Sequence, residues 1–237
     1  ALRKRMDEGI SQDELVSRGE YFSARLMADY LGFEFLDAKL WLKFKYDGSI
    51  DTDASYEALQ KLAQGRSVVI PGFYGVTPDG HIRTLTRGGS DITGSIVARV
   101  FGCEAYENWT DVSGFLMADP RVVPHAKPIQ TITYRELREL SYMGATVLHE
   151  DAVFPVRTAG IPINIRNTND PDAPGTMIVA GTKEYDTERI ITGIAGKKGF
   201  SVITIEKDLM NAEIGFGRRV LDVLEDNEIS FEHLPSG

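Results

Sequence analysis

Two glycines lie between a cation and an anion in one segment of this chain, residues 87–91, which consists of Arg87, Gly88, Gly89, Ser90 and Asp91. Glycine has no side chain, so the backbone N–H groups around it are accessible to a ligand. A helical pattern begins directly after this segment, and the segment can therefore bind an anion at a helix N-terminus. Arg87 can grip a carboxylate or a phosphate, and Asp91 can orient a neighbouring cation or a ligand amine. The structural alternative is a tight turn with a surface arginine and an acid favoured by the helix dipole.

Four further side chains are candidates for ligand contacts. Glu20 is expected near the start of a helix, where it either complements the helix dipole or, if it faces a cleft, binds an amine. Thr110 and Asp111 follow a predicted strand, where they either cap the next turn or bind nucleotide hydroxyls and phosphates. Arg121 follows an Asp-Pro turn and is either a solvated surface group or a phosphate ligand. The four histidines are scattered, and we predict no metal site.

Short β-rich runs alternate with longer segments of helical periodicity, which predicts an α/β domain with a largely parallel sheet. One helix is expected at about 20–31, ending at Gly32, and another behind the glycine segment, with Ile92, Ile96, Val97 and Val100 at helical spacing. Thr133 and Glu136 form a capping box for a third helix, which Gly144 can close. A fourth helix is expected after His149, a hairpin around 78–80, and strands at 67–70, 105–110, 162–166 and 176–179.

The composition excludes several classes of protein. A formal net charge of -9 disfavours a general nucleic-acid role, because phosphate backbones are bound through concentrated lysine and arginine. The single cysteine, Cys103, excludes an internal disulfide and suits a reducing cytosol, so we expect a cytoplasmic protein. No apolar run approaches the roughly 20 residues of a membrane span, and we expect no membrane partner.

The pattern restarts near the C-terminus, and we divide the chain into residues 1–186 and 187–237. The second part has strand-like runs at 190–195, 201–205 and 229–233, and a helix with Val220, Leu221 and Leu224. Two or three strands and one helix in about 50 residues are too few for an independent fold. We therefore expect that this unit is cut short or that another chain completes it.

Taken together, these segments resemble the aspartate kinases of the amino acid kinase family, and the match runs in order through most of the chain. The most specific parts are the segment 17–20, with 23–24, and the segment 71–75 leading to 87–91. Sister kinases such as uridylate and glutamate kinases share the nucleotide-side motif but not these two. The other matching segments are 109–112, 119–121, 144–149 and 167–176.

The resemblance implies a three-layer αβα fold of the carbamate kinase type with a mainly parallel central sheet, followed by a partial ferredoxin-like ACT domain. It implies transfer of the ATP γ-phosphate, with Mg²⁺ accompanying the nucleotide, to the β-carboxylate of L-aspartate. This is the first step toward lysine, threonine and methionine. Because that carboxylate is already ionised at neutral pH, the reaction needs positioning and charge neutralisation more than a base.

The resemblance also implies roles for individual residues. Glu20 would hold the substrate amine and Arg87 a substrate carboxylate, within a binding segment that includes Gly88, Gly89 and Ser90. Asp91 would position a catalytic lysine, and the nucleotide would be served by Thr110, Asp111 and Arg121. The ACT region would bind an end product, lysine or threonine, at a subunit interface near 206–217, and would assemble a dimer or tetramer. The alternative for 206–217 is a polar loop.

Three departures from the family pattern matter. The family's N-terminal lysine-glycine-glycine strand, which supplies the lysine facing the transferred phosphate, is absent from the printed sequence, so we expect this chain alone to be inactive. Thr146 stands where a lysine is common. Leu116 and Met117 stand where Tyr-Thr is commoner, so no adenine contact is carried over there. The alternatives are a different amino acid kinase and a non-catalytic, amino-acid-binding regulatory subunit.

Overall fold

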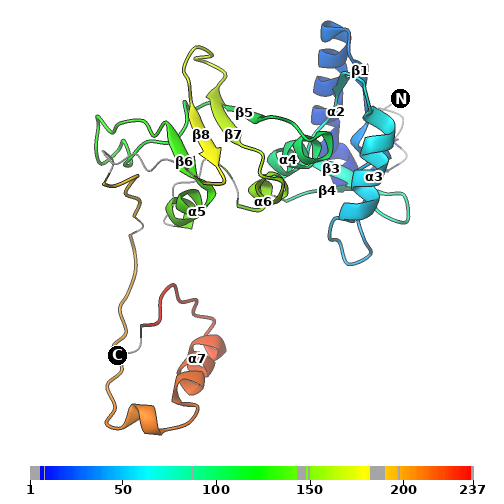
Figure 1. Cartoon of the computed structure of the whole chain (residues 1–237). Helices are drawn as coiled ribbons and strands as arrows, with labels where there is room; N and C mark the ends of the chain where they lie inside the picture. The colour runs from blue at the N-terminus through cyan, green and yellow to red at the C-terminus, as the bar shows by residue number, and fades with distance from the viewer. Residues whose placement is uncertain are drawn as a thin grey trace. The chain divides into compact units, whose positions relative to one another are not determined.

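The computed structural model describes residues 6–7, 9–86, 88–142, 148, 150–181, 190–196 and 198–235 (Figure 1). Arg87, Gly144, Thr146 and His149 lie outside the described residues. The chain divides into two compact units, Ala1–Lys197 and Lys198–Gly237. The expected division into a catalytic part, 1–186, and a regulatory part, 187–237, stays a prediction.

The first long helix, α2 (Gln12–Leu31), begins earlier than the sequence pattern predicts. Its N-cap is Ser11, whose Oγ accepts a hydrogen bond from the backbone N–H of Glu14 at 3.2 Å, and its end at Gly32 (φ 69°) is as predicted. Gly19 suggests a helix start, but a glycine inside a helix costs only about 1 kcal/mol, which capping and packing offset. Glu20 therefore lies in mid-helix, and the expectation that it complements a helix dipole at the N-terminus is wrong.

Small sheets and short helices follow α2. β1 (Glu34–Phe35) pairs in parallel with β2 (Val68–Val69), and the chain between them forms η1 (Ala38–Leu40) and α3 (Thr52–Ala63). The predicted hairpin is confirmed as β3 (Tyr74–Val76) paired antiparallel with β4 (Ile82–Thr84). These elements surround a core in which Trp41, Leu42 and Leu59 are fully buried.

The largest sheet has four strands in the order β5-β7-β8-β6. They are β5 (Tyr106–Thr110), β6 (Thr131–Thr133), β7 (Ile163–Asn167) and β8 (Thr176–Val179). β5, β7 and β8 lie close to the predicted runs, whereas β6 was not predicted. β5 pairs with β7 and β6 with β8 in parallel, whereas β7 and β8 are antiparallel. The sheet is mixed because the loop from β7 to β8 is short, and only antiparallel neighbours can be joined so directly.

Three helices accompany this sheet: α4 (Gly89–Phe101), α5 (Tyr134–Tyr142) and α6 (Glu150–Ala159). The capping box before α5 is confirmed. The backbone N–H of Thr133 donates to Glu136 Oε2 at 2.8 Å, and that of Glu136 donates to Thr133 Oγ1 at 3.2 Å. α4 and α6 pack against each other (Figure 1). The core beneath the sheet includes Ile132, Ile163 and Ile178, all fully buried.

Thr176 connects three segments of this core, and removing its hydroxyl should destabilise the fold. Its Oγ1 accepts a hydrogen bond from the backbone N–H of Phe115 at 2.8 Å and donates to the carbonyl of Ile129 at 2.5 Å, and the side chain is fully buried. Thr176→Val leaves both groups unpaired, so we expect a loss of roughly 2 to 4 kcal/mol in the free energy of unfolding, measured by urea denaturation. Thr176→Ser keeps both bonds and should lose about 1 kcal/mol. Equal stability of the two variants would contradict this assignment.

Unit Lys198–Gly237 contains η2 (Met210–Ala212) and α7 (Phe216–Asp226). The predicted helix is confirmed, but the predicted strands at 201–205 and 229–233 are wrong, as is the run at 190–195 in the first unit. A strand exists only beside a hydrogen-bonded neighbour, and the described residues of these segments supply none. Val202 is 90% exposed and no described residue of α7 is buried, so the described residues of this unit form no core of their own.

No helix in the described part of the chain combines the length and the apolar character that a membrane crossing requires.

Candidate active site

An open groove of about 620 Å³ lies between α2, the segment around β2 and one face of α4. Glu20 from α2 and Ser90 from α4 both line it, together with Gly72, which precedes β3. Two predicted site residues that are 70 positions apart in the sequence therefore face the same space. Glu20 faces a cleft, the condition under which its carboxylate can bind an amine.

The glycines at the start of α4 are required by the local geometry. Gly88 is the N-cap and has φ 77°, a left-handed conformation that glycine adopts without strain. Gly89 is buried, and a Cβ built on it would lie 2.7 Å from Leu85 Cβ and 2.8 Å from Phe73 Cβ. Because residue 89 is a glycine, the N-terminus of α4 can lie against the loop before β3. Any residue with a Cβ at this position would hold the two segments farther apart.

That loop contains a strained residue, Phe73, with φ 60°. Its backbone N–H donates to Thr93 Oγ1 at 3.0 Å, and the Thr93 hydroxyl in turn donates to the carbonyl of Gly89 at 2.8 Å. Such a conformation costs about 1 to 3 kcal/mol and persists only where neighbours hold it, typically at functional sites. Sequence reasoning missed Thr93, and the signal available was a threonine four residues after Gly89 on a predicted helix.

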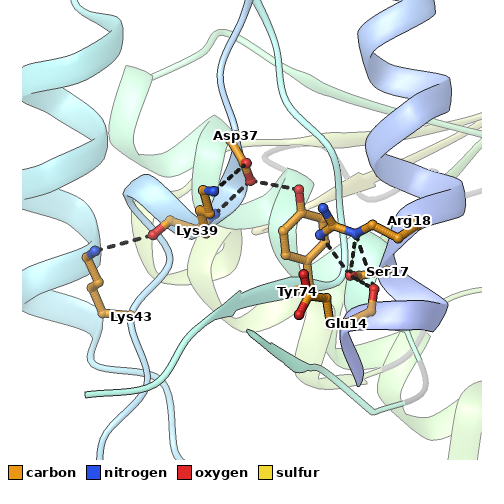
Figure 2. A network of polar contacts seen from close by, with 7 residues as sticks. All are labelled: Glu14, Ser17, Arg18, Asp37, Lys39, Lys43 and Tyr74. Atoms are coloured by element: carbon orange, nitrogen blue, oxygen red, sulfur yellow. Dashed lines mark hydrogen bonds and ion pairs between the residues drawn. The ribbon is translucent and has the colours of Figure 1, made fainter. Parts of the chain in front are cut away.

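A polar network fastens α2 to β3 close to this loop (Figure 2). Tyr74 Oη donates to Asp37 Oδ1 at 2.8 Å, and the ammonium of Lys39 lies 3.7 Å from Asp37 Oδ2. The Arg18 guanidinium lies 5.5 Å from the centre of the Tyr74 ring. Burial and the neighbouring Asp37 carboxylate raise the pKa of Tyr74, so its hydroxyl stays protonated and donates. Because Arg18 is two positions before Glu20, the network helps to fix the helix that carries Glu20.

Asp91 lies in the first turn of α4 and is bound to the neighbouring strand β5. The side-chain amide of Asn108 donates to Asp91 Oδ1 at 2.8 Å and to Tyr106 Oη at 3.1 Å. Burial raises the pKa of Tyr106 to about 12. Sequence reasoning missed both β5 residues, although strand alternation places Tyr106, Asn108 and Thr110 on one face.

Thr110 and Asp111 lie at the carboxyl end of β5, as predicted. The hydroxyl of Thr110 donates to Asp111 Oδ1 at 3.2 Å. The backbone carbonyl of Thr110 accepts from the backbone N–H of Thr168 at 2.8 Å. Since Thr110 shares a strand face with Asn108, the strand links the Asp91 contact to this end of the sheet.

Arg121 is paired with Asp119 at the surface. Its Nη2 lies 2.7 Å from Asp119 Oδ2, and the Arg121 side chain is 88% exposed. The arginine's hydrogen bonds and charge lower the pKa of Asp119. Within the described part of the chain, Arg121 hydrogen-bonds to Asp119 and to neither Thr110 nor Asp111, so a shared nucleotide site for the three residues stays a prediction.

The residues that the structure describes contain no group of three His, Cys, Asp or Glu side chains able to hold a metal ion.

An α/β domain with a glycine-defined helix N-terminus beside a groove, and polar groups past a strand end, is of the class that binds phosphate and carboxylate ligands. The model of the amino acid kinase family matches residues 2–167. This chain belongs to the amino acid kinase family.

Aspartate kinases are among its relatives. The chain is 42% identical to aspartokinase 3 of Bacillus subtilis over 234 residues, which cover 95% of this chain and 51% of the relative. The crystal structure of aspartate kinase from Clostridium acetobutylicum, described as an allosteric enzyme, matches with 51% identity and a TM-score of 0.89, covering 99% of this chain and 53% of that chain. The chain thus spans about half the length of the curated relatives that it matches.

Two structures of Escherichia coli aspartokinase III also match. The complex with aspartate and ADP, in the R-state, has 27% identity and a TM-score of 0.73, covering 95% of this chain and 52% of that one. The complex with lysine and aspartate, in the T-state, has 25% identity and a TM-score of 0.70, covering 95% and 53%. The resemblance to aspartate kinases and the α/β amino acid kinase fold are confirmed.

Proposed function

We propose that the protein is an aspartate kinase that converts L-aspartate and ATP into 4-phospho-L-aspartate and ADP. A β-carboxylate oxygen forms a bond to the γ-phosphorus while the bond from that phosphorus to the leaving oxygen of ADP breaks. The observation that supports this most strongly is the groove beside α4 that Glu20 and Ser90 share. The similarity to a structure that holds aspartate and ADP agrees with it.

An amino acid is the ligand that these residue types favour, because Glu20 and Arg87 would offer opposite charges to the two ends of a zwitterion. Glu20 would bind the α-ammonium, and Arg87 would bind a carboxylate beside the positive end of the α4 dipole. Gly88 and Ser90 would present backbone N–H groups to the same carboxylate, whereas the N–H of Gly89 donates to the carbonyl of Thr86 at 3.1 Å and Gly89 would serve through its small size. Asp91 would then hold the catalytic lysine near the transferred phosphate.

We assign the nucleotide to the carboxyl end of β5, with Thr110 and Asp111 at its hydroxyls and Arg121 at its phosphates. Arg121 would have to exchange Asp119 for a phosphate. That exchange costs little, because an exposed ion pair contributes only about 0 to 1 kcal/mol. Mg²⁺ would enter with the phosphates and would neutralise part of their charge.

This set of residues works by positioning. The aspartate β-carboxylate is ionised at neutral pH, so no side chain need remove a proton. What the protein supplies is orientation of the two substrates and cations for the charge on the transferred group.

We also infer that unit Lys198–Gly237 belongs to an ACT regulatory region that binds lysine or threonine and assembles the protein into a dimer or tetramer in the cytoplasm. Two observations support this inference. The apolar residues Val202 and Ile214 are 90% and 98% exposed, so the unit requires a partner surface. The T-state relative contains lysine.

ADP formation with different acceptors tests the proposed function. The full-length protein should form ADP with ATP and L-aspartate at least about tenfold faster than with L-glutamate, since one methylene group is worth that much in a fitted site. N-acetylglutamate and UMP are the other acceptors to compare. Faster turnover with any of these would indicate a different amino acid kinase. Calorimetric binding of an amino acid without ADP formation would indicate a regulatory subunit.

A further inference from the structure

The first turns of α4 and one face of β5 fit together closely. Asp91 and Gly94 are three positions apart on the helix, and Tyr106 and Asn108 are two positions apart on the strand, so each pair shares a face. A Cβ at Gly94 would collide with the Tyr106 hydroxyl, which shows how near the ring comes to the helix. Asn108 lies beside this contact and is only 8% exposed.

Both amide protons of Asn108 are used in this contact. A carboxylate only accepts hydrogen bonds, so the amide nitrogen, not the oxygen, must face Asp91. One N–H donates to Asp91 Oδ1 at 2.8 Å and the other to Tyr106 Oη at 3.1 Å. The amide plane is thereby fixed from two sides, and with it the position of Asp91 Oδ1.

The other oxygen of the carboxylate is in a different situation. Among the described residues, Asp91 Oδ2 has no hydrogen-bond donor. One oxygen is therefore held by the strand, and among these described residues the second has no such contact.

We propose that Asn108 is a positioning residue that aims the Asp91 carboxylate by binding Oδ1, with Tyr106 holding the amide. The proposal rests on the proposed function, because Asn108 contacts no substrate itself and matters only if Asp91 takes part in the reaction. It acts through Asp91 alone.

The structural alternative is that Asn108 only stabilises the packing of α4 on β5. The two roles differ in their dependence on Asp91. A positioning residue should have no further effect on turnover once the Asp91 carboxylate is gone, whereas a packing residue should have the same effect in either background.

The test is a double-mutant cycle in the full-length protein with Asn108→Leu, Asp91→Asn and their combination. Asn108→Leu should lower kcat roughly 10- to 100-fold and leave the KM for ATP within about threefold, because a misplaced carboxylate affects turnover more than nucleotide binding. In the Asp91→Asn background it should change kcat less than about twofold. Asn108→Asp keeps the side-chain size but places a like charge against Asp91, and should lower kcat at least as much.

Glu107→Gln is the matched control, because residue 107 is the neighbour of Asn108 on the opposite face of β5, where it contacts Trp109 and Arg166. Its kcat should stay within about twofold of the unmodified protein. Equal losses in both Asp91 backgrounds, or an unchanged kcat in Asn108→Leu and Asn108→Asp, would overturn the positioning role. If the unmodified protein forms no ADP with aspartate, the proposed function and this inference both fail.

Discussion

Asp91→Asn is expected to lower the kcat for aspartate-dependent ADP formation roughly 10²- to 10³-fold, the usual effect of removing one preorganised electrostatic contact at a reacting centre. Asparagine has nearly the same shape, and its oxygen can still accept the hydrogen bond from Asn108, so the packing of α4 on β5 is retained. The negative charge is lost, and with it the attraction that would hold the catalytic lysine. Steady-state ADP release with saturating aspartate and ATP measures the effect.

A second helix supplies the control for this prediction. Asp53 is a first-turn acid of α3, exposed to solvent, so Asp53→Asn removes the same dipole-favourable charge from a helix outside the groove. Both variants should lose only about 0.3 to 1 kcal/mol of stability from the dipole. If Asp91→Asn reduces turnover no more than Asp53→Asn does, Asp91 is an ordinary first-turn acid.

Features that depend on a few neighbouring residues were predictable from the sequence. The glycine pair at the start of α4, the hairpin between β3 and β4, and the capping box of Thr133 and Glu136 all lie where the patterns place them. Each results from a local rule: a left-handed conformation, a tight turn, or a side chain three residues from the backbone group it caps.

The features that were missed depend on contacts between distant residues. Asn108 is 17 positions from Asp91, and Tyr74 is 37 positions from Asp37, so no local pattern indicates either hydrogen bond. The positive φ of Phe73 likewise follows from its contact with Thr93 on α4.

Two predictions were wrong because a local signal was outweighed. Ser11 caps α2, and the helix continues through Gly19, which moves Glu20 into mid-helix. The β-branched run at 201–205 has the composition of a strand, but the described residues of its unit offer no neighbouring strand. A better-placed N-cap decided the first structure, and the lack of a described neighbouring strand decided the second.

Arg87→Ala is expected to weaken aspartate binding by about 2 to 4 kcal/mol, which is roughly a 30- to 1000-fold rise in the KM for aspartate. Arginine binds a carboxylate through two parallel hydrogen bonds, so its loss should affect the amino acid far more than ATP, whose KM should stay within about threefold. Arg87→Lys keeps a point charge without the planar fork and should fall between the two. The prediction assumes that the side chain immediately before Gly88 serves the groove lined by Glu20 and Ser90.

The matched control for this change is Arg83→Ala. Arg83 is an exposed arginine of β4, four residues earlier, whose guanidinium lies 5.7 Å from the centre of the Phe44 ring. The substitution Arg83→Ala removes the same charge from a nearby position that does not line the groove. Because an exposed charge is screened by solvent and salt, the KM for aspartate should rise less than about twofold. Equal effects of the two variants would show that general electrostatic attraction, and not a clamp at residue 87, brings aspartate to the site. An unchanged KM in Arg87→Ala would remove Arg87 from the substrate site, and Glu20 would then be left to recognise the amino acid through its ammonium group alone.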